Sequence, residues 1–269
     1  MERDLFENLS TRNRLSRHPG YYYFKKTLLV LKGAHNIFHK NYFDWKRFCD
    51  EFRNVDDDIR FNDAWRWRKQ KAIVRSFHNL IVSFCSYIEH IEGLKHPFSK
   101  DTSLANNVRD KLRGFKNDER TAFITLLRNM MVHQQVYPLV SKGVGVKNKS
   151  NGRNEINRFQ SIRREEVESY IDSPGHQKSK NAAKPFLKKQ PEGINIELIL
   201  KDYLDALESF HCEIVFAVIS TFESDLILFR DNVSEYLKST PKANFPINGL
   251  QLRYLQFLLH CYSKHTESL

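Results

Sequence analysis

The sequence predicts an all-α fold with one small β-hairpin, and three observations support this prediction. The chain has 269 residues with only 10 Gly and 8 Pro, too few chain breakers for a sandwich or barrel with frequent turns. Apolar residues recur every three or four positions along several long segments. They make up 41% of the chain, which suffices for a buried core. The length fits one large domain or two small ones.

The first 20 residues are polar and Arg-rich and end at Pro19-Gly20, so we expect a flexible basic N-terminal arm over residues 1–20, either a tail or an arm that caps the fold. A single helical domain is expected over residues 21–269. Its first segment, residues 21–52, suits one long helix or two shorter ones, because Gly33 interrupts the pattern.

The clearest helical pattern runs from about Asn62 to Gly93. Its expected core residues are Ile73, Phe77, Leu80, Phe84, Ile88 and Ile91. A second row at the same helical spacing is polar and holds Asn79, Ser83, Ser86 and His90. This polar row is either an ordinary solvated face or the lining of a site.

The rest of the chain predicts further helices, one hairpin and one loop. Helices are expected over residues 101–113, 117–137, 163–171, 196–237 and 248–263. Two β-compatible runs within residues 138–162 flank Asn151-Gly152, a dipeptide typical of hairpin turns. Residues 173–193 predict a flexible basic loop that contacts RNA phosphates through its five lysines, Lys178, Lys180, Lys184, Lys188 and Lys189.

The charge of the chain favours a polyanionic partner. There are 43 Lys and Arg against 32 Asp and Glu, a formal net charge of +11, which points to nucleic acid before an acidic membrane surface. The N-terminal residues lack the apolar stretch of a secretion signal, and no segment reads as a membrane span. The four cysteines show no zinc or disulfide spacing, so we expect core thiols and a cytoplasmic protein.

One short motif carries chemistry. At the end of the helix over residues 117–137, Arg128 and Asn129 precede His133, and Pro138 follows. Five residues correspond to about 500° of helical rotation, so Arg128 and His133 stand roughly 140° apart, whereas Asn129 and His133 share a face. The long Arg128 side chain must therefore reach round to serve the same cleft. The negative end of the helix dipole favours a protonated His133, which suits a general acid.

This motif resembles that of the HEPN superfamily, all-helical domains in which an Arg followed by a polar residue precedes a His by five positions. The resemblance covers residues 62–230, but its specific part is six residues long. It implies a metal-independent endoribonuclease of toxin or antiviral-defence type, with Arg128, Asn129 and His133 as its catalytic centre. It also implies that a polar residue of the preceding helix lines the cleft.

The resemblance further implies a homodimer that joins two copies of the motif around one phosphodiester. Two His and two Arg would then supply the base, the acid and the cation that attack by a 2′-OH requires. DNA lacks this nucleophile and would be spared. Restraint of such a nuclease would come from a separate antitoxin or regulatory protein, or from closure of a loop.

Two other functional readings stay open: a non-catalytic HEPN-like module that binds RNA or a protein partner, and a scaffold that happens to contain the motif. No cofactor is expected. His35 and His39 have the spacing of zinc ligands on a helix, but no third ligand follows, so no metal is expected. Trp65 and Trp67 are interpreted as packing residues rather than as base-stacking platforms.

Overall fold

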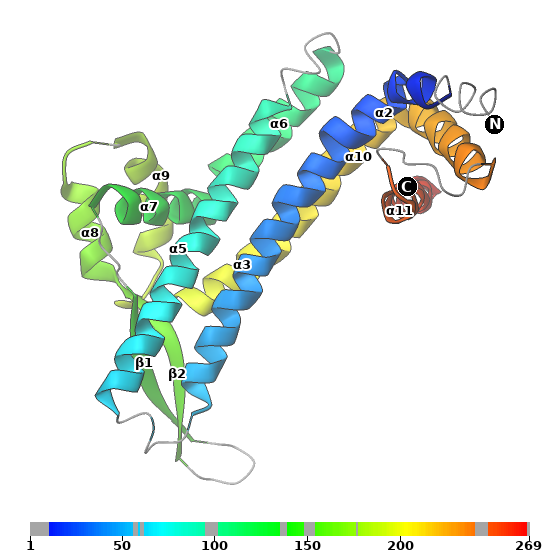
Figure 1. Cartoon of the computed structure of the whole chain (residues 1–269). Coiled ribbons are helices and arrows are strands. Elements are labelled where there is room, and N and C mark those ends of the chain that lie inside the picture. The colour runs from blue at the N-terminus through cyan, green and yellow to red at the C-terminus, as the bar shows by residue number, and fades with distance from the viewer. Residues whose placement is uncertain are drawn as a thin grey trace. The chain divides into compact units, whose positions relative to one another are not determined.

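The structure is a computed structural model that describes residues 11–55, 59, 62–94, 102–134, 139–147, 154–175, 177–239 and 247–267. The side chains of residues 102, 133, 134, 144–147 and 154–157 lie outside this description. The described chain is mostly helical with one small antiparallel sheet, as the sequence predicts (Figure 1).

The contacts divide the chain into two compact units, which are described separately. Unit 1 comprises Met1–Gly33, Gly93–Arg109 and His211–Leu269, and unit 2 comprises Ala34–Glu92 and Asp110–Phe210. The region covered by the resemblance, residues 62–230, therefore draws on both units.

The helices lie close to their predicted positions, and Gly33 does not interrupt the first one. In chain order they are α2 (Pro19–Tyr23), the π-helix η1 (Phe24–Leu28), α3 (Leu29–Arg53), α5 (Asp63–Gly93), α6 (Thr102–Asn117), α7 (Glu119–Gln134), α8 (Arg164–Asp172), α9 (Gln177–Lys188), α10 (Ile196–Ser239) and α11 (Gly249–Glu267).

The predicted hairpin is present. Strand β1 (Leu139–Lys147) pairs antiparallel with β2 (Asn154–Arg163), while the predicted turn residues Asn151-Gly152 lie outside the described residues. A third strand, β3 (Gly193–Asn195), pairs with the other edge of β2. Three residues are too few to show an alternating pattern, so β3 was not predictable from periodicity.

The core of unit 2 forms around α5. All six predicted core residues of this helix are buried. Phe77 lies 6.0 Å from Trp45 of α3, and Phe84 makes an edge-to-face contact of 4.9 Å with Tyr203 of α10, measured between ring centroids. The three-to-four spacing thus places an aromatic face of α5 against its neighbours, as expected for an amphipathic helix.

In unit 1, the predicted flexible arm is wrong for residues 11–20. Residues 11–16 are helical, Leu15 is buried, and the His18 ring accepts a hydrogen bond of 3.0 Å from the Gly20 N–H. A Cβ at Gly20 would overlap the Asp225 carbonyl and Phe229 of α10, so this close approach requires glycine. The Pro19-Gly20 pair therefore begins a packed helix and does not end a tail.

The predicted loop over residues 173–193 is also wrong, because residues 177–188 form α9. One side of α9 packs on α7 through buried Ala183, Phe186 and Leu187, and the Phe186 ring lies 5.0 Å from that of Phe123. These apolar residues stand among lysines and beside Pro185, which masked the helical spacing in the sequence.

The cysteines are only partly as predicted. Cys49 is buried, but Cys212 is exposed, so they are not all core thiols. Among the described helices, none has an apolar stretch long enough to cross a bilayer.

Candidate functional site

Helix α7, which carries the motif, is held inside unit 2. Its first turn is capped by Asp118, whose Oδ1 accepts hydrogen bonds from the N–H groups of Arg120 (3.0 Å) and Thr121 (3.1 Å). Apolar side chains on several sides of the helix are buried: Phe123, Ile124, Leu126, Leu127, Met130 and Met131. A helix enclosed in this way fixes the position of any polar residue that it carries.

Arg128 and Asn129 contact one another. The Arg128 Nη1 donates to Asn129 Oδ1 at 3.2 Å, and Asn129 is buried. Adjacent helical residues point apart, so the Arg128 side chain bends to reach its neighbour. Whether it also serves the same cleft as His133 stays a prediction. The Asn129 amide donates in turn to the Ser179 hydroxyl of α9 at 3.4 Å. The backbone of His133 belongs to α7, but its side chain lies outside the described part of the chain.

A small cavity of about 180 Å³ lies beside Arg128. Its polar lining combines Arg128 and Asn129 with Lys116 of α6 and with three residues of α5, Cys85, Glu89 and Glu92. Lys116 forms an ion pair with Glu92. The Nε of Arg128 is buried and has no hydrogen-bond partner among the described residues. This N–H is enclosed by protein atoms, whereas the Arg128 side chain as a whole is half-buried and lines the cavity, where its positive charge favours an anion.

The four residues of the predicted polar row, Asn79, Ser83, Ser86 and His90, are not among those that line this cavity. Ser83 is buried and its hydroxyl donates to the Leu80 carbonyl of its own helix at 2.8 Å. The row that does reach Arg128 contains Cys85, Glu89 and Glu92. It stands next to the predicted row on the helix surface, and its mixed composition gave no signal in the sequence.

Cys85 is not an activated nucleophile. Burial raises the pKa of its thiol to about 11, and the neighbouring Arg128 charge acts in the opposite direction without overcoming burial. The thiol is therefore protonated at neutral pH, and a protonated thiol is a poor nucleophile. The ionic groups at this cavity are Arg128, Lys116 and the two glutamates.

The five lysines predicted to hold RNA have different environments. Lys180 is fully buried and donates to the Ser173 carbonyl (2.6 Å) and hydroxyl (2.9 Å), so it is not a phosphate contact in this fold. Lys189 pairs with Glu119 at 2.7 Å. Lys178 and Lys188 are exposed and Lys184 is half-buried; for these three a phosphate contact stays a prediction.

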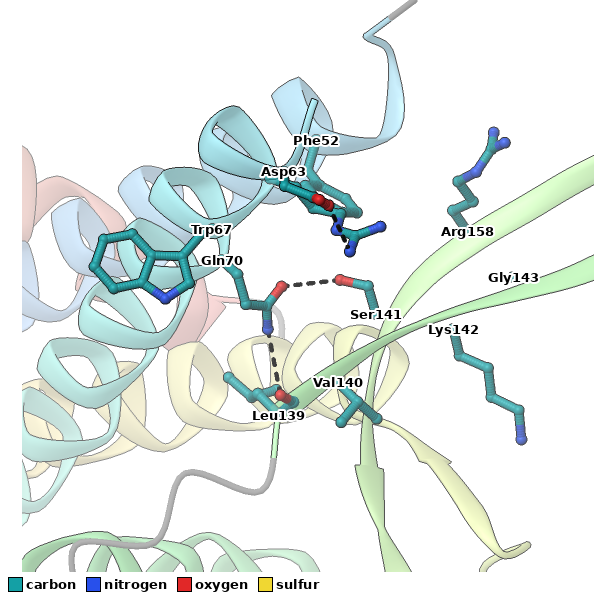
Figure 2. Close-up of a pocket in the computed structure, with 11 residues that line it drawn as sticks. Phe52, Asp63, Trp67, Gln70, Leu139, Val140, Ser141, Lys142, Gly143 and Arg158 are labelled. Atoms are coloured by element: carbon teal, nitrogen blue, oxygen red, sulfur yellow. Dashed lines mark hydrogen bonds and ion pairs between the residues drawn. The ribbon is translucent and has the colours of Figure 1, made fainter. Parts of the chain in front are cut away.

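A second and larger pocket of about 800 Å³ lies between the start of α5 and the hairpin. Gln70 bridges its two walls (Figure 2): its amide donates to the Leu139 carbonyl at 3.2 Å and accepts from the Ser141 hydroxyl at 3.0 Å. Arg66, Lys142 and Arg158 also line the pocket. The sequence gave no sign of this pocket, because its walls come from elements 70 residues apart.

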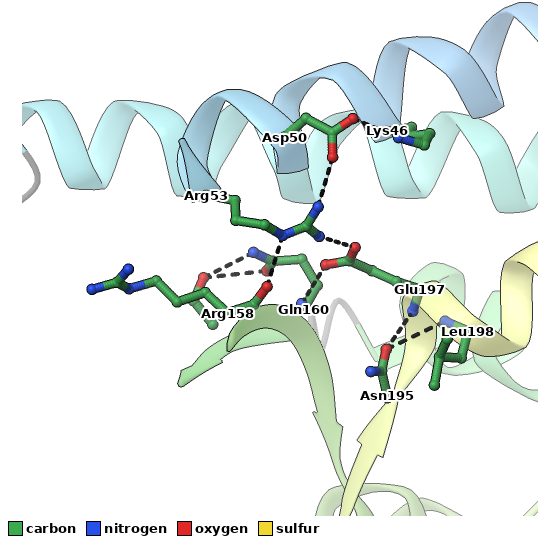
Figure 3. A network of polar contacts seen from close by, with 9 residues as sticks. Lys46, Asp50, Arg53, Arg158, Gln160, Asn195, Glu197 and Leu198 are labelled. Carbon is green, nitrogen blue, oxygen red and sulfur yellow. Dashed lines mark hydrogen bonds and ion pairs between the residues drawn. The ribbon is translucent and has the colours of Figure 1, made fainter. Parts of the chain in front are cut away.

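An ion-pair network holds the hairpin against the helices (Figure 3). Arg53 at the end of α3 donates to Asp50 (2.7 Å) and to the Arg158 carbonyl of β2 (2.8 Å), and it pairs with Glu197. Glu197 in the first turn of α10 also accepts from the Gln160 N–H at 2.7 Å. One guanidinium thus connects α3, β2 and α10.

Trp65 and Trp67 have different environments, which the sequence did not predict. Trp65 stacks on Phe52 with ring centroids 5.8 Å apart, as a packing residue would. Trp67 is 63% exposed and lines the pocket of Figure 2, and Lys71 lies 4.1 Å above its ring. Packing is therefore the wrong interpretation for Trp67.

His35 and His39 contact each other on α3. Their Nε2 atoms are 3.1 Å apart, and the His39 Nε2 lies 3.3 Å from Glu208 of α10. Burial, followed by the proximity of His39, lowers the pKa of His35 to about 4. Within the described residues, no group of three or more His, Cys, Asp or Glu has an arrangement that could hold a metal ion.

Comparisons of the chain with protein-family models, with curated proteins and with solved structures found no match.

Proposed function

We propose that this protein is a metal-independent endoribonuclease of toxin or antiviral-defence type, with its centre at Arg128, Asn129 and His133. The observation that supports this most is the state of Arg128. Its guanidinium is oriented by Asn129, lines a cavity and keeps a buried Nε–H without a partner among the described residues. A guanidinium positioned in this way at a cavity stabilises the charge that develops on a phosphate during transfer.

The chemistry follows from the residue types. The 2′-OH attacks the adjacent phosphorus, the 5′-oxygen leaves, and a 2′,3′-cyclic phosphate forms. His133, four residues after Asn129 on α7, would move the protons, and Arg128 would hold the phosphate oxygens. This reaction needs RNA, and the cytoplasm is where such a nuclease would meet it.

The size of the cavity supports a homodimer as the active form. About 180 Å³ is below the roughly 300 Å³ at which ligand pockets begin, so one chain does not enclose a nucleotide here. A second copy related by a two-fold axis would bring another Arg128 and His133 to the same phosphodiester. A separate antitoxin or regulatory protein would then restrain the enzyme by covering this surface.

One observation favours the alternative, a non-catalytic module that binds RNA or a protein. Glu89 and Glu92 stand at the same cavity as Arg128 and Lys116, so the local charges offset one another. Two carboxylates next to a phosphate would weaken its binding unless they move or are protonated.

The test is cleavage of RNA in EDTA by the wild type and by His133→Ala and Arg128→Ala. We expect products with 2′,3′-cyclic phosphate ends and a loss of at least about 100-fold in rate for each variant. Arg120→Ala is the matched control, because Arg120 lies on the same helix but interacts with Asp118. Equal cleavage by all four proteins indicates a contaminating nuclease. RNA that stays intact but bound supports the non-catalytic module.

A further inference from the structure

The N-terminal half of α5 carries an exposed row of cations that the proposed active centre does not use. Arg68, Lys71 and Arg75 are exposed, and they line a hollow of about 510 Å³ together with half-buried His78. We call these four residues, with Trp67, the basic face of α5. Their spacing of three and four residues places them on one side of the helix.

Several exposed cations of unit 2 pair with an acidic residue, whereas these three have no acidic partner among the described residues. Arg47 pairs with Asp44, Arg113 with Asp110, and Lys69 with Glu51. Within the described part of the chain, Arg68, Lys71 and Arg75 form no ion pair with a carboxylate. Three cations on about two turns of helix, with no carboxylate of the described residues to offset them, create a local positive potential that attracts a polyanion.

Trp67 adds an exposed aromatic ring to this row of cations. Its indole is 63% exposed at the edge of the 800 Å³ pocket, with Lys71 above one face of the ring. An exposed aromatic ring beside a row of cations is the arrangement that binds single-stranded nucleic acid, with a base on the ring and phosphates on the cations.

The basic face leads toward Arg128. Continuing along α5 from Arg75 and His78 with the same alternation of three and four residues reaches Cys85 and Glu89, which line the Arg128 cavity. The 14 residues from Arg75 to Glu89 span about 21 Å of helix, or roughly six nucleotides of a stacked strand. A strand on the basic face would thus be aligned with the proposed centre.

From these observations we infer that the basic face of α5 is a binding track for single-stranded RNA, with phosphates on Arg68, Lys71 and Arg75 and a base stacked on Trp67. Binding by this track holds whether or not the chain cleaves RNA; only its role in guiding substrate rests on the proposed function.

The test uses a short 2′-O-methyl oligouridine, which lacks the nucleophile and is bound without being cut. Fluorescence anisotropy at several salt concentrations compares the wild type with the triple variant Arg68→Gln, Lys71→Gln, Arg75→Gln. We expect about a 10- to 100-fold loss of affinity at low salt, and a salt slope smaller by about 2, since each single-strand phosphate contact contributes about 0.7.

The matched control is Lys46→Gln, Arg47→Gln, Arg113→Gln, which removes the same charge from exposed residues that have acidic partners. Trp67→Ala should weaken binding by roughly 5- to 100-fold with an unchanged salt slope, because stacking does not release counterions. Circular dichroism checks that each variant is folded.

Three results would overturn the inference: affinity and slope retained in the α5 triple variant, an equal loss in the control triple, or tighter binding to anionic phosphatidylglycerol vesicles than to the oligonucleotide. Intact binding with no cleavage of natural RNA would reject only the proposed nuclease.

Discussion

The basic residues of the N-terminal half of α5 and of α9 are similarly dense in the sequence but have different environments in the structure. On α9, Lys180 is buried against Ser173, and Lys189, directly after the helix, pairs with Glu119, so part of the charge of this segment belongs to the fold. On α5, Arg68, Lys71 and Arg75 are exposed and form no ion pair with a described carboxylate.

The difference shows that whether a basic side chain is free to bind a ligand depends on how the apolar face of its helix packs. The apolar side of α9 packs on α7 and draws one lysine into the interior. The apolar side of α5 is complete without its cations, which stay on the surface. The predictions below test this contrast, beginning with the cation that is most deeply involved in the fold.

Arg53→Met should have the largest effect on stability, about 2–3 kcal/mol. Removal of the guanidinium leaves Glu197, which is 20% exposed, without its ion-pair partner and the Arg158 carbonyl without its donor (Figure 3). Urea unfolding followed by circular dichroism measures the change. Arg75→Met, on the basic face of α5, should change stability by less than about 0.5 kcal/mol. Similar losses for the two variants would remove the distinction between structural and available cations.

Lys180→Met should cost about 2 kcal/mol, because it keeps the buried aliphatic stem but leaves the Ser173 carbonyl at the end of α8 without its charged donor. Lys178→Met, on the exposed side of the same helix, is the control and should be close to neutral. Thermal unfolding of both variants decides this. An unchanged stability of Lys180→Met would mean that Lys180 contributes no more to the fold than the exposed Lys178.

His35 is a third case, a side chain whose positively charged form is disfavoured by its environment in the native structure. Its pKa is lowered from 6.5 to about 4, so between these values the unfolded chain binds a proton that the native chain does not. Stability should fall as the pH drops from about 6.5 to about 4, by roughly 1–2 kcal/mol for this half-buried ring.

Urea unfolding of the wild type and of His35→Gln across this pH range isolates the contribution of His35. The difference in stability between the two proteins should narrow as the pH falls. A constant difference in stability would mean that His35 has the same pKa in the native and in the unfolded state.

Periodicity predicted the helices because burial imposes it: all six expected core residues of α5 are buried, and the hairpin lies where alternation and Asn151-Gly152 indicated. Periodicity did not predict α9, because Lys180 occupies a buried position where the helical pattern requires an apolar residue. For the candidate site, the sequence predicted Arg128, Asn129 and His133, of which the first two line one cavity. It could not indicate Cys85, Glu89 or Trp67, since their neighbours are set by packing between distant segments.

The smallest expected effect concerns the lysines that α9 leaves outside ion pairs with described carboxylates. The triple variant Lys178→Gln, Lys184→Gln, Lys188→Gln removes as much charge as the α5 triple variant. Lys184 is half-buried, and none of the three lies over an aromatic ring of the described residues, so we expect at most about a threefold loss of affinity for 2′-O-methyl RNA. The salt slope should fall by less than about 1, because scattered cations neutralise few phosphates at once. A loss equal to that of the α5 triple variant would place the RNA on both helices, and a larger loss would move the binding track from α5 to α9.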